Sequence, residues 1–250
     1  MRSVHFVLQG KGGVGKSFIA ALLAQYLHQF DLKVICFDTD PVNQTFSRYQ
    51  RLNVQSINIL TEHKNIDASC FDALIETLIM HDGLAVIDNG ASTFVPLMSY
   101  MRENEVVPLL QEAGVQVVIH VPLQAGQGLP DTLTGLNTVL TDFPCEVVVW
   151  LNHYWGRVET QGKTFEQWNI AKNNAEQIAG VIELSNYNPD TYGRDILKMT
   201  SNHLTFQEVL HSSEFTLMPK QRLKKVQRDV FEQLAVQGIF AALEGGRSGS

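Results

Sequence analysis

Residues 10–17, GKGGVGKS, combine glycines, two lysines and a serine at a spacing that suits phosphate binding. Glycines let successive backbone N–H groups approach an anion, and a following helix adds unpaired N–H groups and the positive end of its dipole. Gly10, Gly15, Lys16 and Ser17 match the G-x-x-x-x-G-K-[ST] pattern of a P-loop. There Lys16 would reach the β- and γ-phosphates of a nucleotide, and the Ser17 hydroxyl would bind Mg²⁺.

The segments around this loop have the right character for a P-loop. An apolar run at residues 4–8 predicts a buried strand, and apolar residues at helical spacing over 19–30 predict a helix. Strand, glycine-rich turn and helix is the context that a P-loop requires. The residues expected to bind the nucleotide here are Gly12, Gly13, Val14, Gly15, Lys16, Ser17 and Phe18.

A dinucleotide-binding loop is the alternative. Residues 10–15 also spell G-x-G-x-x-G, and Asp38 ends the next strand, where a ribose-binding acid belongs. Lys16 and Ser17 have no assigned task in a dinucleotide site, whereas both have one in a P-loop. The P-loop interpretation is therefore favoured.

Carboxylates follow two of the apolar strands that the sequence predicts. Residues 33–38 end in Asp38, and residues 84–88 end in Asp88. Open α/β sheets bind ligands at the carboxyl ends of their parallel strands. Asp88 is the natural Walker B acid for Mg²⁺. Asp38 and Asp40 project to the same side, so one could serve the metal shell while the other orients the attacking water.

The remaining periodicity predicts an α/β fold: a three-layer sandwich with a mostly parallel, P-loop NTPase-type central sheet flanked by helices. Further strands are expected at 54–60, on an edge, and at 116–121, 146–151 and 181–184. Helices are expected at 69–80, 95–103, 106–112, 129–141, 165–174 and 219–243. We expect residues 1–244 to form a single P-loop ATPase domain and residues 245–250 to be a linker or tag remnant.

Composition narrows the class of protein. The 250 residues carry a formal net charge of −7, which argues against a protein that coats nucleic acid over its whole surface. The three cysteines are far apart and read as core residues of a reducing compartment. With no signal peptide and no apolar stretch near 18 residues, we expect a cytoplasmic protein.

Lys11 is a second lysine that an ordinary P-loop does not need. With it the loop resembles the deviant Walker A motif of the ParA/MinD family of SIMIBI-class P-loop ATPases, K-G-G-x-G-K-[ST], which stands here as KGGVGKS. The resemblance implies ATP or ADP and Mg²⁺ as cofactors, and a homodimer in which Lys11 reaches the partner's phosphates. It also implies that Asp40, in the D-x-D-P switch at residues 38–41, is the hydrolytic residue, and that Asn152 reads adenine.

Longer strings, among them residues 7–27 and VVWLNHYWG, look like the TraL-type ATPases of bacterial conjugative plasmids. This implies an accessory or positioning role in conjugal DNA transfer, with protein partners in the relaxosome or secretion machinery and recruitment to the inner face of the membrane through them. Two departures lie in the switch regions: Val42 replaces a glutamine, and residues 89–91 replace a segment ending in proline and glycine. They leave open a nucleotide-binding interaction protein with little or no hydrolysis.

Other interpretations are weaker. A metabolic ligase of the same superfamily lacks a recognisable substrate signature, and an iron–sulfur reductase lacks a cysteine pair to bridge subunits. A basic cluster on the last helix could contact DNA or acidic lipid, but a solvated helix face is favoured. The aromatic residues Trp150, Tyr154, Trp155 and Trp168 are expected to form a core or near-nucleotide cluster, with a partner surface as the alternative. Residues 124–128 are expected to be a mobile loop without chemistry.

Overall fold

The computed structural model describes residues 2–30, 32–57, 59 and 67–240. Seven parallel strands form one sheet in the order β3-β2-β4-β1-β5-β6-β7. The strands are β1 (Ser3–Val7), β2 (Val34–Asp38), β3 (Gln55–Ser56), β4 (Leu84–Asp88), β5 (Gln116–Gln124), β6 (Glu146–Asn152) and β7 (Ile178–Leu184). Five of them, β1, β2, β4, β5 and β6, are the apolar runs that the sequence marks, because a parallel strand covered on both faces reads as a continuous apolar segment.

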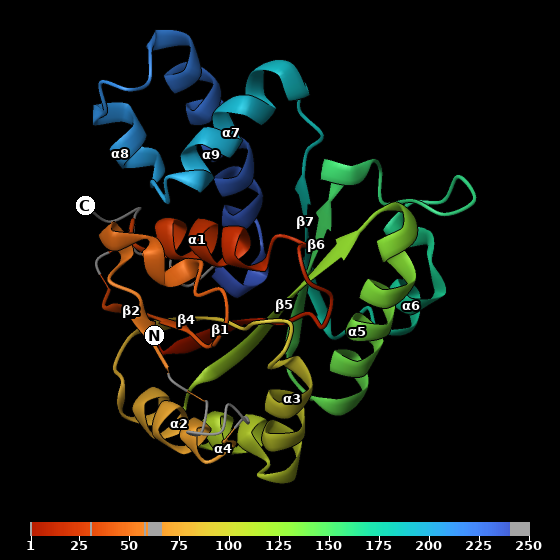
Figure 1. The fold of residues 1–250 in the computed structure, drawn as a ribbon. Coiled ribbons are helices and arrows are strands. Elements are labelled where there is room, and N and C mark those ends of the chain that lie inside the picture. Colours follow the sequence, from red (N-terminus) through yellow and green to blue (C-terminus); the bar gives the residue numbers. More distant parts are fainter. Residues whose placement is uncertain (1, 31, 58, 60–66, 241–250) are drawn as a thin grey trace.

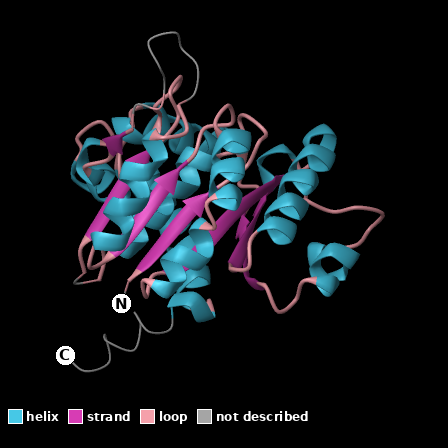
Figure 2. Cartoon of the chain, turned by 90° about the horizontal axis from the view of Figure 1, so that it is seen from below, coloured by secondary structure: helices cyan, strands magenta, loops and turns pink. Residues whose placement is uncertain are grey.

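Helices cover both faces of this sheet, so the chain forms three layers (Figures 1 and 2). On one face lie α1 (Lys16–Leu27), α7 (Arg194–Ser201), α8 (Phe206–His211) and α9 (Leu217–Ala235). On the other lie α2 (Cys70–Met80), α3 (Phe94–Glu103), α4 (Val106–Glu112), α5 (Leu129–Asp142) and α6 (Asn169–Asn173). Each layer buries its own apolar cluster against the sheet. The expected three-layer α/β fold with a parallel central sheet is confirmed.

Several element bounds differ from the sequence expectation. Strand β3 covers Gln55 and Ser56 of the edge strand expected at 54–60, where it pairs with the last two residues of β2, which ends at Asp38. Residues 58 and 60 lie outside the described residues. Helix α6 is only five residues long, and α9 ends at Ala235, before the expected 243. Residues 241–250, which include the expected linker, lie outside the described residues. Strand β5 runs on to Gln124, so the segment expected to be a loop begins inside the sheet.

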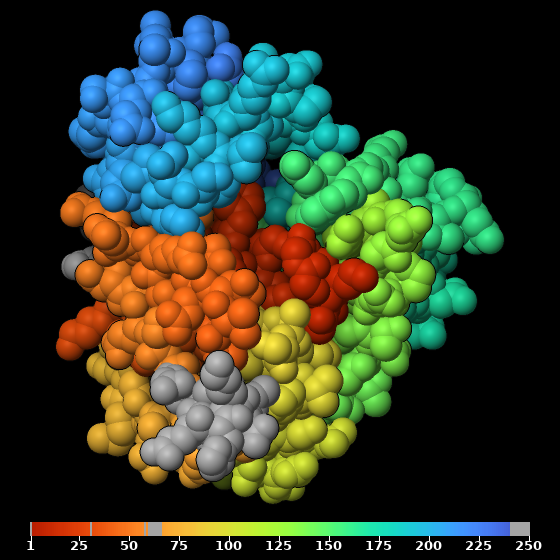
Figure 3. All heavy atoms as spheres, viewed as in Figure 1, coloured from red at the N-terminus to blue at the C-terminus, as the bar shows by residue number. Residues whose placement is uncertain are grey.

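The strand order places the carboxyl ends of β1, β2 and β4 side by side. Asp38 pairs with Asp88 in the register of β2 and β4, and Val7 pairs with Asp88 in that of β1 and β4. The P-loop leaves β1 at this point and enters α1. In the space-filling view, its red atoms reach the surface between orange, yellow and green segments (Figure 3). The sheet topology therefore gathers at one edge the polar residues that the sequence singles out.

Candidate functional site

The loop at residues 10–15 connects β1 to α1 in a conformation that depends on glycine. Gly13 and Gly15 have φ values of +74° and +94°, in the region that side chains disfavour. A Cβ on Gly13 would meet no atom within 4 Å, so the outer side of the loop is open. Val14 is buried instead and anchors the loop to the protein. The backbone thus presents an open concave turn at the start of α1, which suits an anion.

Lys16 begins α1 and is almost fully buried beside this turn. Its Nζ donates a hydrogen bond to the carbonyl oxygen of Lys11, 3.0 Å away, across the loop. Burial lowers the pKa of Lys16, while the charges of Asp88 and Asp40 act in the opposite direction. The ammonium group therefore faces both the loop and two of the acids at the strand ends.

Asp88, the last residue of β4, has an unusual environment for a carboxylate. It is 2% exposed, and its Oδ1 has no hydrogen-bond partner among the described residues. Burial raises the pKa of Asp88 to about 7, although a hydrogen bond from the Ser17 side chain and the charge of Lys16 oppose the rise. A buried carboxylate oxygen without a donor, beside a serine hydroxyl, has the chemistry that Mg²⁺ requires. Ser17 and Asp88 therefore fit a magnesium ion.

Asp38 and Asp40 lie next to this pair but make different contacts. Asp38 is buried, and its two oxygens accept hydrogen bonds from the backbone N–H of Asp40 (3.0 Å) and of Ser47 (2.9 Å). Asp40 is half-buried, and its carboxylate accepts from the N–H of Val42 (2.9 Å) and from the N–H and side chain of Asn43 (both 3.1 Å). Burial alone would raise the pKa of Asp40, but these hydrogen bonds and Lys16 leave it lowered. Asp40 is therefore an anion held by its own turn.

Lys11 points away from the loop and forms an ion pair in the same chain. Its Nζ lies 2.8 Å from Oδ2 of Asp131, in the first turn of α5, and both side chains are exposed. Asp131 was not expected from the sequence, because 120 residues separate it from Lys11 and no motif marks it. An exposed pair of this kind contributes at most about 1 kcal/mol to stability, so exchanging it for another partner costs little.

Asn152 ends β6 on the other side of the loop. Its Nδ2 donates to the carbonyl oxygen of Val14 at 3.0 Å, and its Oδ1 accepts from the N–H of Tyr154 at 3.1 Å. A Cβ on Gly15 would lie 3.1 Å from the same Nδ2. The amide thus ties the P-loop to the segment that follows β6. Phe18, by contrast, packs its partly buried side chain against the core, so its backbone alone could face a ligand.

Comparisons with known proteins agree with this geometry. Residues 5–226 match the family described as the CobQ/CobB/MinD/ParA nucleotide binding domain. The chain belongs to this family. A Protein TraL from Escherichia coli is 45% identical over 236 residues, covering 94% of this chain and 98% of the relative. The similarity to the ParA/MinD family and its TraL-type members, expected from the motifs, is confirmed.

Solved structures resemble the chain in fold. The septum site-determining protein MinD complexed with Mg-ADP from Pyrococcus horikoshii OT3 has a TM-score of 0.51 at 18% identity, covering 96% of this chain and 98% of that protein. The MinC:MinD cell division protein complex from Aquifex aeolicus has a TM-score of 0.48 at 15% identity, covering 92% of this chain and 96% of that protein. The first of these likenesses supports the MinD-type fold, and at this level of identity it supports the fold alone.

The four aromatic residues that the sequence expectation places in one core or near-nucleotide cluster do not lie together. Trp150 is fully buried in β6, whereas Tyr154 and Trp155 are 71% and 46% exposed and contact each other edge to face. Trp168 packs on Phe165, on the opposite side of the sheet from α9. The expected single cluster is therefore wrong, because residues 150 and 154 lie on either side of the strand end.

Three basic side chains of α9 form ion pairs within the chain. Arg222 pairs with Asp195 at 2.5 Å, and Lys225 pairs with Asp229. Arg228 lies within 4.0 Å of Asp229. These pairs agree with the favoured interpretation, a solvated helix face. In the described part of the chain, no helix is long and apolar enough to cross a membrane.

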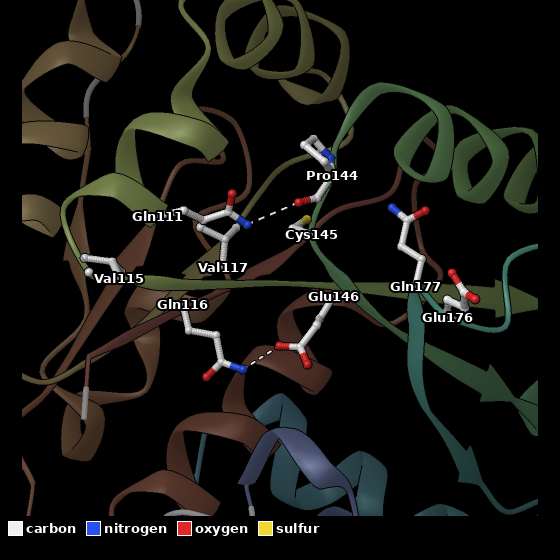
Figure 4. A pocket seen from close by; sticks show the side chains of 10 residues that line it. Gln111, Val115, Gln116, Val117, Pro144, Cys145, Glu146, Glu176 and Gln177 are labelled. Carbon is white, nitrogen blue, oxygen red and sulfur yellow. Dashed lines mark hydrogen bonds between the residues drawn. The ribbon is translucent and has the colours of Figure 1, made fainter.

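A cavity of about 640 Å³ lies at the opposite, amino edge of the sheet (Figure 4). Several of its polar side chains bond to neighbouring groups: Gln111 donates to the carbonyl oxygen of Pro144 at 3.1 Å, and Gln116 donates to Glu146. Cys145 lines it, but burial raises the pKa of this thiol to about 12, which disfavours the reactive thiolate. Among the described residues, the buried side-chain atom that lacks a hydrogen-bond partner, Oδ1 of Asp88, lies instead at the carboxyl edge.

Proposed function

We propose that the protein is a Mg²⁺-dependent ATPase of the ParA/MinD type, formed as a single domain by residues 1–244, which dimerises around ATP and uses that dimer as a molecular switch. The nucleotide would bind to residues 12–18 with Asn152, and the metal to Ser17, Asp88 and Asp38. Lys11, Lys16 and Asp40 would act in catalysis. The family match to a nucleotide-binding domain and the geometry of the P-loop support this proposal.

The single observation that carries the proposal is the unpaired Oδ1 of Asp88. A buried polar atom without a partner normally destabilises a fold, and such atoms persist where a ligand completes them. Here the neighbours are a serine hydroxyl and a lysine ammonium at the start of a helix, the groups that bind Mg²⁺ and phosphate in a P-loop. Mg²⁺ would supply charge stabilisation for the β- and γ-phosphate oxygens.

Two residues would act on the reaction besides Lys16. Asp40 is an anion and would orient the attacking water through its Oδ2, once the Asn43 side chain releases that oxygen. Lys11 would leave Asp131 and place its ammonium on the phosphates bound by a second copy of the chain. The exposure of the Lys11–Asp131 pair supports this exchange, because the pair can open without exposing any core.

Partners and location follow from the TraL-type similarity. We propose a role as an accessory or positioning factor in plasmid conjugal transfer, acting in the bacterial cytoplasm with protein components of the relaxosome or secretion machinery. Recruitment to the inner membrane face would occur through these partners. Direct contact of α9 with DNA or lipid is weakly supported, since three of its basic residues are paired with acids.

A nucleotide-binding interaction protein with little or no hydrolysis is the second candidate. Every hydrogen bond that holds the Asp40 carboxylate comes from its own turn, and Val42 in that turn is 73% exposed. If this turn keeps its conformation when ATP binds, Asp40 cannot reach the attacking water. The protein would then bind ATP and hydrolyse it slowly or not at all. Tight ATP binding with turnover that Asp40→Ala does not change would favour this candidate.

Molar mass by light scattering after size exclusion tests the proposal, with no nucleotide, Mg·ADP and Mg·ATP compared. We expect Mg·ATP to produce a dimer, Asp40→Ala to trap it, and Lys11→Ala to abolish it while ATP still binds. Lys172→Ala, an exposed lysine on α6, is the control and should dimerise normally. A chain that binds ATP but never changes mass would contradict the dimer, and one that does not bind ATP would contradict the whole proposal.

A further inference from the structure

Asn89 follows Asp88 directly and joins two separate loops with one side chain. It is fully buried, and its Oδ1 accepts hydrogen bonds from the hydroxyls of Thr39 (2.9 Å) and Thr93 (2.8 Å). Its Nδ2 donates to the carbonyl oxygen of Gly90 at 3.1 Å. Thr39 lies in the acidic loop, residues 38–43, and Thr93 lies in the β4–α3 turn, residues 89–93. Both threonines are also fully buried.

Each hydroxyl has one proton, and geometry indicates where it goes. Oγ1 of Thr39 is 2.9 Å from the Asn89 oxygen and 3.2 Å from the carbonyl oxygen of Asp88. Oγ1 of Thr93 is 2.8 Å from the Asn89 oxygen and 3.0 Å from that of Gly90. In both cases the side-chain oxygen is the nearer acceptor. The Asn89 amide therefore receives both hydroxyl protons and links the acidic loop to the β4–α3 turn.

A second contact brings Asp40 into the same unit. A Cβ on Gly90 would lie 2.6 Å from Cγ and 2.9 Å from Oδ2 of Asp40, far closer than side chains tolerate. The Asp40 carboxylate therefore packs directly on the backbone of Gly90. Asp40 is thus positioned from two sides, by Thr39 before it in the chain and by Gly90 from the β4–α3 turn. Asn89 adjoins both.

We propose that Asn89 is a positioning residue, which makes the acidic loop and the β4–α3 turn move as one unit and so fixes Asp40 for hydrolysis. The link between the loops stands on the contacts alone, whereas its effect on hydrolysis rests on the proposed function. A nucleotide that displaces either loop would then displace both. Residues 89–91, which depart from the usual sequence of the family, would in this way join the acidic loop to the β4–α3 turn.

Hydrogen–deuterium exchange of the whole protein, without nucleotide, tests the link. Thr93→Val keeps the side-chain shape but removes the hydroxyl, and the Thr93 side chain makes no cap bond to α3, so the helix start is retained. We expect exchange of the amides in residues 38–47 to rise about tenfold, the factor that corresponds to losing one buried hydrogen bond. Thr93→Ser restores the hydroxyl and should restore the protection.

Thr77→Val on α2 is the control, because within the described residues the Thr77 hydroxyl bonds only to the carbonyl of Ala73 in its own helix, 2.7 Å away. It should leave residues 38–47 unchanged. If Thr93→Val raises exchange in residues 89–93 alone, the loops are independent and the inference is overturned. Asn89→Ala should have the larger effect of the two variants, and the Thr93 pair decides the question if Asn89→Ala does not fold.

Steady-state kinetics tests the effect on Asp40. We expect Thr93→Val to lower the turnover number for ATP about tenfold with little change in KM or in Mg·ATP affinity, because the P-loop is untouched. Thr93→Ser should recover the rate. An unchanged turnover number, with exchange raised in both loops, would overturn the positioning of Asp40. If the wild-type protein does not bind ATP, the proposed function fails, while the exchange experiment still decides on the link.

Discussion

Two groups of buried ionisable residues in the same sheet differ in how completely they are paired. In the histidine chain, Trp150 Nε1 donates to His120 Nδ1 at 3.0 Å, His120 Nε2 lies 3.0 Å from His5 Nδ1, and His5 Nε2 lies 3.1 Å from Ser3 Oγ. At the strand ends, Asp88 keeps one buried oxygen without a donor. Burial shifts the pKa of both groups strongly, but the histidine chain is satisfied internally and Asp88 is not.

The pairing pattern fixes the protonation of the histidine chain. An indole N–H can only donate, so His120 accepts at Nδ1 and carries its proton on Nε2, which it donates to His5. His5 then carries its proton on Nε2, facing Ser3. Burial lowers the pKa of His5 to about 3 and that of His120 well below its usual value, so both stay neutral. A chain of side chains whose hydrogen bonds are all made stabilises the fold, whereas the unpaired oxygen of Asp88 is available to a ligand.

Breaking the histidine chain should have the largest effect on stability. His120→Leu leaves the Trp150 N–H and the His5 Nδ1 buried without partners, and each orphan costs roughly 1 to 3 kcal/mol. We expect the free energy of unfolding in urea to fall by about 2 to 5 kcal/mol. His211→Asn, at the exposed end of α8, is the control and should change it little. A loss below about 1 kcal/mol for His120→Leu would show that the chain is not stabilising.

In the absence of ligand, Asp88→Asn should raise the free energy of unfolding, whereas breaking the histidine chain should lower it. The burial that raises the Asp88 pKa to about 7 disfavours its charged form, so removing the charge should stabilise the free protein at pH 8. We expect a gain of about 1 to 4 kcal/mol, since one pKa unit corresponds to about 1.4 kcal/mol. The same variant should gain less from Mg·ATP than the wild type. Thermal unfolding with and without Mg·ATP measures both effects.

The exposed Asp190, whose side chain is 82% exposed and lies 3.6 Å from Arg194, supplies the control. Asp190→Asn removes a carboxylate that is largely solvated, so its melting temperature should move little in either condition. A lower melting temperature for ligand-free Asp88→Asn would mean that Asp88 is a structural acid, and the comparison with the histidine chain would then lose its basis.

The sequence predicts the secondary structure that carries the two groups, but not the side-chain contacts that they make. Apolar runs predict the central strands, and the glycine and lysine spacing predicts the turn before α1. Contacts that join distant residues cannot be read from local patterns. Examples are His5 with His120, Lys11 with Asp131, and Asn89 with Thr39.

Strand register decides the first of these contacts. Val7 pairs with His120 in the sheet, which puts His5 and His120 on the same face two positions apart, and a shift by one residue would separate them. The edge strand depends on its neighbour in the same way. Alternation over 54–60 predicts a longer element, but β3 pairs with Phe37 and Asp38, the last two residues of β2, which ends there.

The smallest expected effect is on the pH dependence of stability, because the two groups change the free energy of unfolding in opposite directions as pH changes. Neutral histidines are favoured in the fold, so their contribution is present above pH 6.5 and is lost as pH falls toward the His5 pKa of about 3. The Asp88 pKa is raised, so its contribution is present at acidic pH and is lost as pH rises from 3.8 through about 7. Between about pH 4 and 6.5 the two slopes oppose each other.

Asp88→Asn should therefore lose stability more steeply than the wild type as pH falls from 6.5 to 4. The difference in slope should be at most about 1.4 kcal/mol per pH unit, which is the effect of one proton. His120→Leu removes a titrating histidine and should instead flatten the loss. Urea unfolding at half-unit pH steps measures the three curves. Parallel curves for Asp88→Asn and the wild type would show that Asp88 is ionised throughout, and its carboxylate would then have to be stabilised by the Ser17 hydroxyl and Lys16.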